Sequence, residues 1–65
     1  MKVYLNGEPL EVADDTLAAA LEAAGYGGAK VATAVNEDFV PAAARAATPI
    51  EPGDRIEVVT PRQGG

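Results

Sequence analysis

The dipeptide Asn6-Gly7 lies between two short runs of alternating apolar and polar residues, and it constrains the fold more than any other feature. A type I′ turn requires a positive φ at both central residues, and Asn-Gly adopts this conformation readily. We therefore expect residues 2–5 and 10–12 to pair as a β-hairpin. Pro9 is expected at the edge or the entry of the second strand, where a missing N–H does little harm.

The next segment changes from the period of a strand to the period of a helix. Apolar side chains recur at i, i+3, i+4 and i+7, at Leu17, Ala20, Leu21 and Ala24. The Asp and Thr residues of segment 14–16 favour a helix N-cap. Gly25 suits the left-handed position that follows a helix C-terminus. The pattern predicts one main helix of about ten residues.

The second half of the chain predicts three more strands and a short helix. We expect strands at residues 31–35, 39–40 and 55–60, one or two helical turns at 42–47, and a type II turn at 51–54. The predicted order is β-β-α-β-β-(short helix)-β, which is that of an α+β roll. If the last strand lies beside the first, the helix packs across one face of a mixed sheet of about five strands.

The chain has 65 residues and no cysteine, so the fold has neither a disulfide nor a thiolate metal site. A chain of this length forms one small domain, and its stability has to come from packing. We expect a single domain at residues 1–60, followed by a flexible tail at residues 61–65 that ends in Gly-Gly.

The charge and the apolar pattern indicate where the protein works. The net charge is −5 and the five basic residues are scattered, which disfavours nucleic acid as a partner. No apolar stretch reaches the ~20 residues needed to span a bilayer, and the turn at Asn6-Gly7 comes too early for a signal peptide. We expect a cytoplasmic protein that is a monomer when free and has no membrane partner.

The side chains offer little chemistry, because the sequence contains no Cys, His, Ser or Trp. These residues supply most nucleophiles and general acids or bases that act near neutral pH. The carboxylate of Gly65, which follows Gly64, is the most useful chemical group in the sequence. We therefore predict a protein that is not an enzyme and whose reactive group is that carboxylate.

Five segments carry a resemblance to a known family. They are LNGE at 5–8, Asp15-Thr16-Leu17 with Leu21, VNEDFVP at 35–41, GDRIEVV at 53–59 and QGG at 63–65. In this order and spacing they resemble the ubiquitin-like β-grasp sulfur carriers, and most closely the ThiS family of thiamine biosynthesis. The resemblance covers nearly the whole chain.

This resemblance implies a function in which other proteins do the catalysis. A ThiF-like adenylyltransferase, similar to E1 enzymes, would use ATP to adenylate Gly65. The adenylate would become a thiocarboxylate, with sulfur that originates from cysteine through a cysteine desulfurase. The thiocarboxylate would then donate its sulfur to the thiazole ring on a thiazole synthase (ThiG-like). The carrier itself is expected to bind no cofactor and no metal.

The tail residues suit recognition by such enzymes. Gly64 and Gly65 have no Cβ, so an enzyme can approach their backbone closely. Pro61 is expected to keep the tail extended where it leaves the sheet. Arg62 and Gln63 can hydrogen-bond the wall of an enzyme channel, although Arg62 equally fits a solvated surface charge.

The strand pattern also predicts a docking face. The alternation places Val3, Leu5, Ile56 and Val58 toward the helix. The other face of the sheet is then lined by Tyr4, Ala32, Ala34 and Val59. Exposed apolar residues gathered on one face suggest an interface, and scattered apolar residues of no consequence are the alternative.

Other functions stay open at this point. A MoaD-type carrier uses the same fold and diglycine to bring sulfur to molybdopterin. A ubiquitin-like tag would be conjugated to other proteins through Gly65, and a plain β-grasp docking module would make no use of Gly65.

Two weaker motifs do not indicate a ligand site. Segment 25–30 has glycines before a lysine but lacks the G-K-[ST] of a phosphate loop. The acidic pairs at 14–15 and 37–38 suit a cap and a turn better than a metal site.

Overall fold

The computed structural model describes residues 1–60. The predictions for the tail, from Pro61 to Gly65, lie outside the described residues. The elements within residues 1–60 follow the predicted order: β1 (Lys2–Leu5), β2 (Glu8–Glu11), α1 (Leu17–Ala23), β3 (Ala32–Val35), β4 (Asp38–Val40), the 3₁₀ helix η1 (Ala42–Ala47) and β5 (Arg55–Val59).

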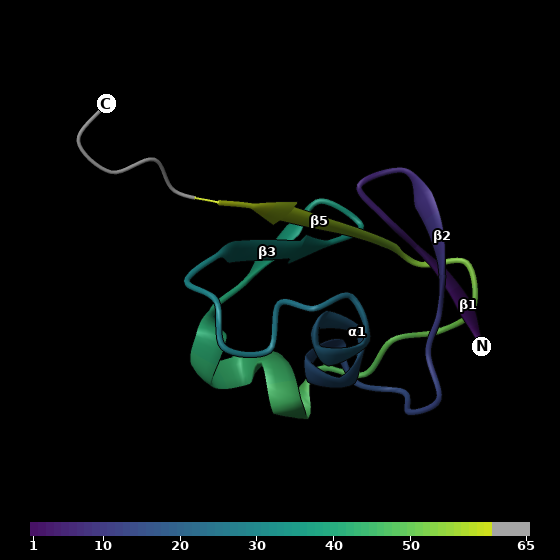
Figure 1. Ribbon diagram of the computed structural model, residues 1–65, viewed down its shortest axis with the longest axis horizontal. Helices are drawn as coiled ribbons and strands as arrows, with labels where there is room; N and C mark the ends of the chain where they lie inside the picture. The colour runs from purple at the N-terminus through teal and green to yellow at the C-terminus, as the bar shows by residue number, and fades with distance from the viewer. Residues whose placement is uncertain (61–65) are drawn as a thin grey trace.

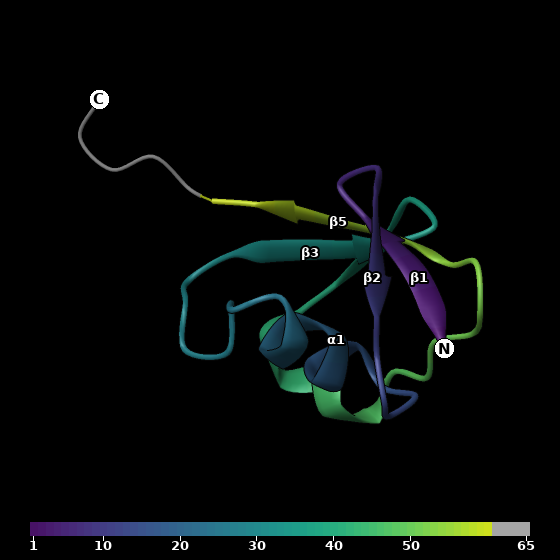
Figure 2. The same ribbon diagram turned by 45° about the vertical axis from the view of Figure 1, so that its right-hand side comes forward.

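The five strands form one mixed sheet in the order β2-β1-β5-β3-β4. The last strand lies beside the first, which is the condition that the sequence left open, and it is parallel to it; the other neighbours are antiparallel. Both helices lie on the same side of this sheet (Figures 1 and 2). This arrangement is an α+β roll, as the element order predicts, and it is the ubiquitin-like β-grasp fold that the family resemblance implies.

The first hairpin forms through the expected turn. Asn6 and Gly7 have φ of 52° and 85°, which are the positive values that a type I′ turn requires. Because the turn has only two residues, Glu8 is already paired with Leu5, and β2 begins two residues earlier than predicted. Pro9 lies within β2, which is an edge strand of the sheet.

The main helix is shorter than predicted but has the predicted caps. Thr16 is the N-cap, and its Oγ1 accepts a hydrogen bond from the Ala19 N–H at 3.1 Å. Gly25 follows the C-cap with φ of 91°, a conformation that costs glycine little. The helix itself has seven residues, between the N-cap Thr16 and the C-cap Ala24.

The core lies between the sheet and the two helices. Its buried apolar side chains are Val3, Val12, Leu17, Ala20, Leu21, Val40, Ile50, Ile56 and Val58. Thr33 is the one buried polar residue among residues 1–60. Its hydroxyl donates to the Val40 carbonyl at 2.9 Å and accepts from Arg45 Nε at 3.1 Å, so its polar atom is satisfied. The first bond joins β3 to β4, and the second ties η1 to β3.

Candidate functional site

The candidate site is the outer face of the sheet, which is the face opposite α1 and η1. Strand β5 alternates along its length, so Ile56 and Val58 are buried while Arg55, Glu57 and Val59 are exposed. The exposed side chains of β5 therefore share the outer face. Since β5 is the last described strand, this face adjoins the start of the carboxyl-terminal segment.

Three of the four predicted docking residues lie together on this face. Ala32 is paired with Val59, and Ala34 is the next outward residue of β3 and is paired with Glu57. Tyr4 lies farther along the face, where it is paired with Arg55. The structure thus places all four residues on the predicted side, with Tyr4 at a distance from the other three.

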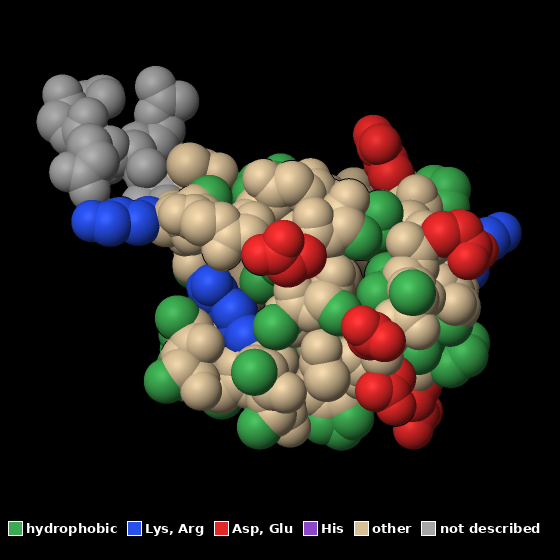
Figure 3. Space-filling view, turned by 60° about the horizontal axis from the view of Figure 1, so that its bottom comes forward, with side chains coloured by type: hydrophobic (Ala, Val, Ile, Leu, Met, Phe, Trp, Pro, Cys, Tyr) green, Lys and Arg blue, Asp and Glu red, His purple; other side chains and the backbone are tan. Residues whose placement is uncertain are grey.

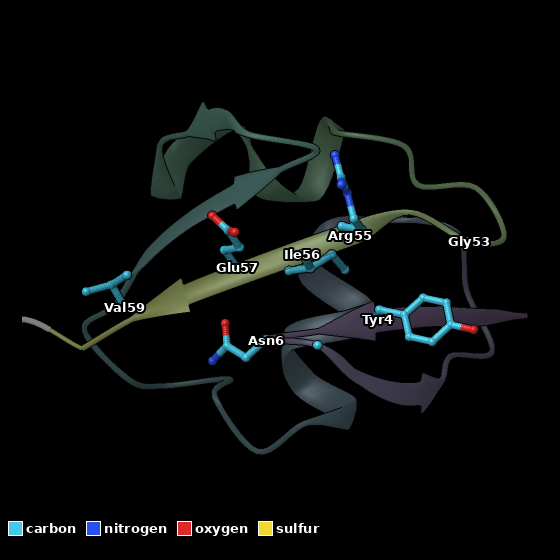
Figure 4. Close-up of a pocket in the computed structure, with 8 residues that line it drawn as sticks. Tyr4, Asn6, Gly53, Arg55, Ile56, Glu57 and Val59 are labelled. Carbon is cyan, nitrogen blue, oxygen red and sulfur yellow. The ribbon is translucent and has the colours of Figure 1, made fainter.

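A groove of about 670 Å³ runs along β5 between Tyr4 and Val59. Its lining consists of Tyr4, Asn6, Gly7, Gly53, Arg55, Ile56, Glu57 and Val59. Figure 4 shows the Tyr4 ring at one end and Val59 at the other, with the charged side chains of β5 between them. The groove is therefore apolar at its ends and polar in its middle.

The side chain of Asn6 holds β5 beside the groove. Its Oδ1 accepts the Val58 N–H at 2.9 Å and its Nδ2 donates to the Val58 carbonyl at 3.2 Å. The backbone N–H of Asn6 donates to the Ile56 carbonyl at 2.8 Å. Strand β1 ends at Leu5, so the amide of Asn6 takes the place of the next strand residue and satisfies both backbone groups of Val58.

A second asparagine does the same on the other side of β5. The Asn36 N–H donates to the Arg55 carbonyl at 2.7 Å, and its Oδ1 accepts the Arg55 N–H at 3.0 Å. Its Nδ2 donates to Asp54 Oδ1 at 3.1 Å. Two turn residues therefore fix the strand that precedes the tail, one near its start and one near its end.

Sequence reasoning missed Phe39, which belongs to the same face. Its side chain is 69% exposed, and it is paired with Ala34. Val59 is 63% exposed, so these two are the most exposed large apolar residues of the described chain. The signal was present in the sequence, because Phe39 alternates with Val40, and Val40 is buried.

The remaining predicted site residues fall outside this description. Arg62, Gln63, Gly64 and Gly65 lie beyond the described residues. Among residues 1–60, no group of three or more potential metal ligands comes together. No helix in the same range has the length and apolar character needed to cross a membrane.

Comparison with known proteins finds a matching family and matching solved structures. The model of the ThiS family matches residues 3–65. Among solved structures, the crystal structure of a thiamine biosynthesis protein (ThiS) from Geobacter metallireducens is 28% identical with a TM-score of 0.80. That match covers 100% of both chains. No curated protein matches the chain.

Proposed function

Because the chain belongs to the ThiS family, we propose that it is a sulfur carrier of thiamine biosynthesis that bears sulfur on Gly65. The observation that carries this proposal is the family match, which runs from residue 3 through Gly65 and so includes the Gln-Gly-Gly ending. It also favours thiamine biosynthesis over the molybdopterin pathway of MoaD-type carriers.

The chemistry needs an activating step. A terminal carboxylate is ionised at neutral pH and is a poor electrophile. In the proposed step, a carboxylate oxygen of Gly65 attacks the α-phosphorus of ATP and displaces pyrophosphate. A persulfide from the desulfurase then displaces AMP from the acyl adenylate, and thiols reduce the resulting acyl disulfide by two electrons to leave the thiocarboxylate. A ThiF-like adenylyltransferase supplies the catalysis, with a cysteine desulfurase upstream and a ThiG-like thiazole synthase as acceptor.

The chain supplies the carrier group and the surfaces that its partners recognise. Gly64 and Gly65 allow close approach to the backbone, and Arg62 and Gln63 are proposed to contact the enzyme channel. The outer face, with Tyr4, Ala32, Ala34 and Val59, is the proposed docking surface. The protein itself is not an enzyme in this proposal, and it works in the cytoplasm, where ATP and cysteine are available.

The function is tested by the mass of the intact protein. The chain is incubated with the activating enzyme and the cysteine desulfurase of its host, with ATP, cysteine and a thiol that reduces the persulfide sulfur. We expect a species heavier by the exchange of one oxygen for sulfur, which fragmentation assigns to Gly65. The variant that lacks Gly65 serves as the control and should stay unmodified.

Two results would contradict the proposal. One is the absence of any adenylate or thiocarboxylate on the full chain under conditions in which the enzyme is active on a known carrier. The other is the appearance of isopeptide adducts to lysines of other proteins without a thiocarboxylate, which would identify a conjugated tag.

A further inference from the structure

A second and smaller hollow lies on the outer face, over β3. It has a volume of about 180 Å³. Ala32 and Ala34 form its floor, because the outward positions of β3 carry only methyl groups. Phe39 from β4 and Val59 from β5 flank this floor, and Glu57 also lines the hollow.

The size of the hollow indicates what it can hold. Pockets for small-molecule ligands have volumes of about 300–1,000 Å³, so this hollow falls below that range. A space of this size suits one long side chain of a partner protein better than a free ligand.

The charge of the hollow indicates which side chain fits. Glu57 is exposed, and its carboxylate leans from β5 toward β3 (Figure 4). The ion pairs within residues 1–60 involve Glu11 and Glu37, so no cation of that range lies within 4.0 Å of Glu57. A carboxylate beside an apolar floor and an exposed phenyl ring matches a side chain with an apolar stem and a cationic head.

We propose that this hollow receives an arginine side chain of the activating enzyme. The methylene groups of the arginine would lie on Ala32 and Ala34. Its guanidinium would donate to the Glu57 carboxylate and lie over the Phe39 ring, which favours a planar cation. The inference rests on the proposed function, because that function makes the activating enzyme the partner of this face.

The experiment compares two substitutions that remove the same charge. Adenylation of Gly65 by the activating enzyme is followed through ATP–pyrophosphate exchange, at increasing concentrations of the carrier. Glu57→Gln removes the carboxylate from the hollow. Glu51→Gln is the matched control, because Glu51 is exposed in the turn before β5, and its side chain makes no hydrogen bond or ion pair within residues 1–60.

The expected result is a change in apparent affinity alone. Glu57→Gln should raise the half-saturating concentration of carrier about tenfold and leave the maximal rate unchanged. Glu51→Gln should change the half-saturating concentration by less than about twofold. Phe39→Ala should also weaken binding, and both effects should appear without a shift in melting temperature, because these side chains are exposed.

Two outcomes overturn the inference and can be told apart. If the wild-type carrier is not adenylated, the proposed function fails and the inference fails with it. If the wild-type carrier is adenylated but Glu57→Gln and Glu51→Gln act alike, the proposed function stands and the arginine site is wrong.

Discussion

At the scale of single residues, the turns of the two β-hairpins differ in how well their residues tolerate a positive φ. In each turn the first central residue is an asparagine, and the two central residues of each turn have positive φ. The second residue is Gly7 in the first turn but Glu37 in the other, where φ is 75°. A residue with a Cβ pays about 1–2 kcal/mol in the left-handed region. The β3–β4 turn therefore keeps a local strain that the first turn avoids.

We expect Glu37→Gly to stabilise the protein by about 0.5–1 kcal/mol, because glycine removes this strain. The ion pair that it loses, with Arg55 at 4.0 Å, is exposed and contributes little. Chemical denaturation measures the free energy of unfolding. Glu37→Gln is the control, because it removes the charge and keeps the Cβ, and it should leave stability nearly unchanged. Equal stability of the glycine and glutamine variants would refute the strain argument.

At the scale of elements, β5 takes its position from residues that are distant in the sequence. The hairpin, the helix with its caps and the alternation of β5 could all be predicted, because each depends on neighbours within a few residues. The bonds between Asn6 and Val58 could not be predicted, because they join residues 52 positions apart. Local patterns predict which residues face the core, whereas such contacts require the three-dimensional arrangement of the strands.

Substitution of Asn6 by Asp tests how far its amide holds the end of β5. Aspartate keeps an acceptor for the Val58 N–H but loses the donor for the Val58 carbonyl. Its negative charge also repels the carbonyl oxygen of Val58. We expect a loss of about 1–2 kcal/mol in stability. Amide hydrogen exchange should show reduced protection at Val58 beyond the global change. A uniform loss of protection across the sheet would show that Asn6 has no particular effect on β5.

At the scale of the whole molecule, stability and recognition use opposite faces of one sheet. The inner face buries the core against α1 and η1, whereas the outer face leaves its apolar side chains in solvent. Acidic side chains gather over one side of the helix-bearing surface, where basic ones are few (Figure 3). The net charge of −5 favours approach of a basic partner and opposes association between two copies of the chain.

The separation of the two faces predicts that a charge at Val59 impairs function without loss of folding. Val59 is 63% exposed and paired with Ala32 at the edge of the hollow, so a lysine there meets no core residue. Val59→Lys should reduce thiocarboxylate formation about tenfold, because it removes apolar contact and repels a cationic partner. Its melting temperature should stay within a few degrees of wild type, since surface substitutions change stability by about 0.5 kcal/mol or less.

The neighbour Val58 provides the contrast, because it is 7% exposed and faces the core, so Val58→Lys should unfold the domain. A normal thiocarboxylate yield from a folded Val59→Lys protein would exclude this end of the face from docking.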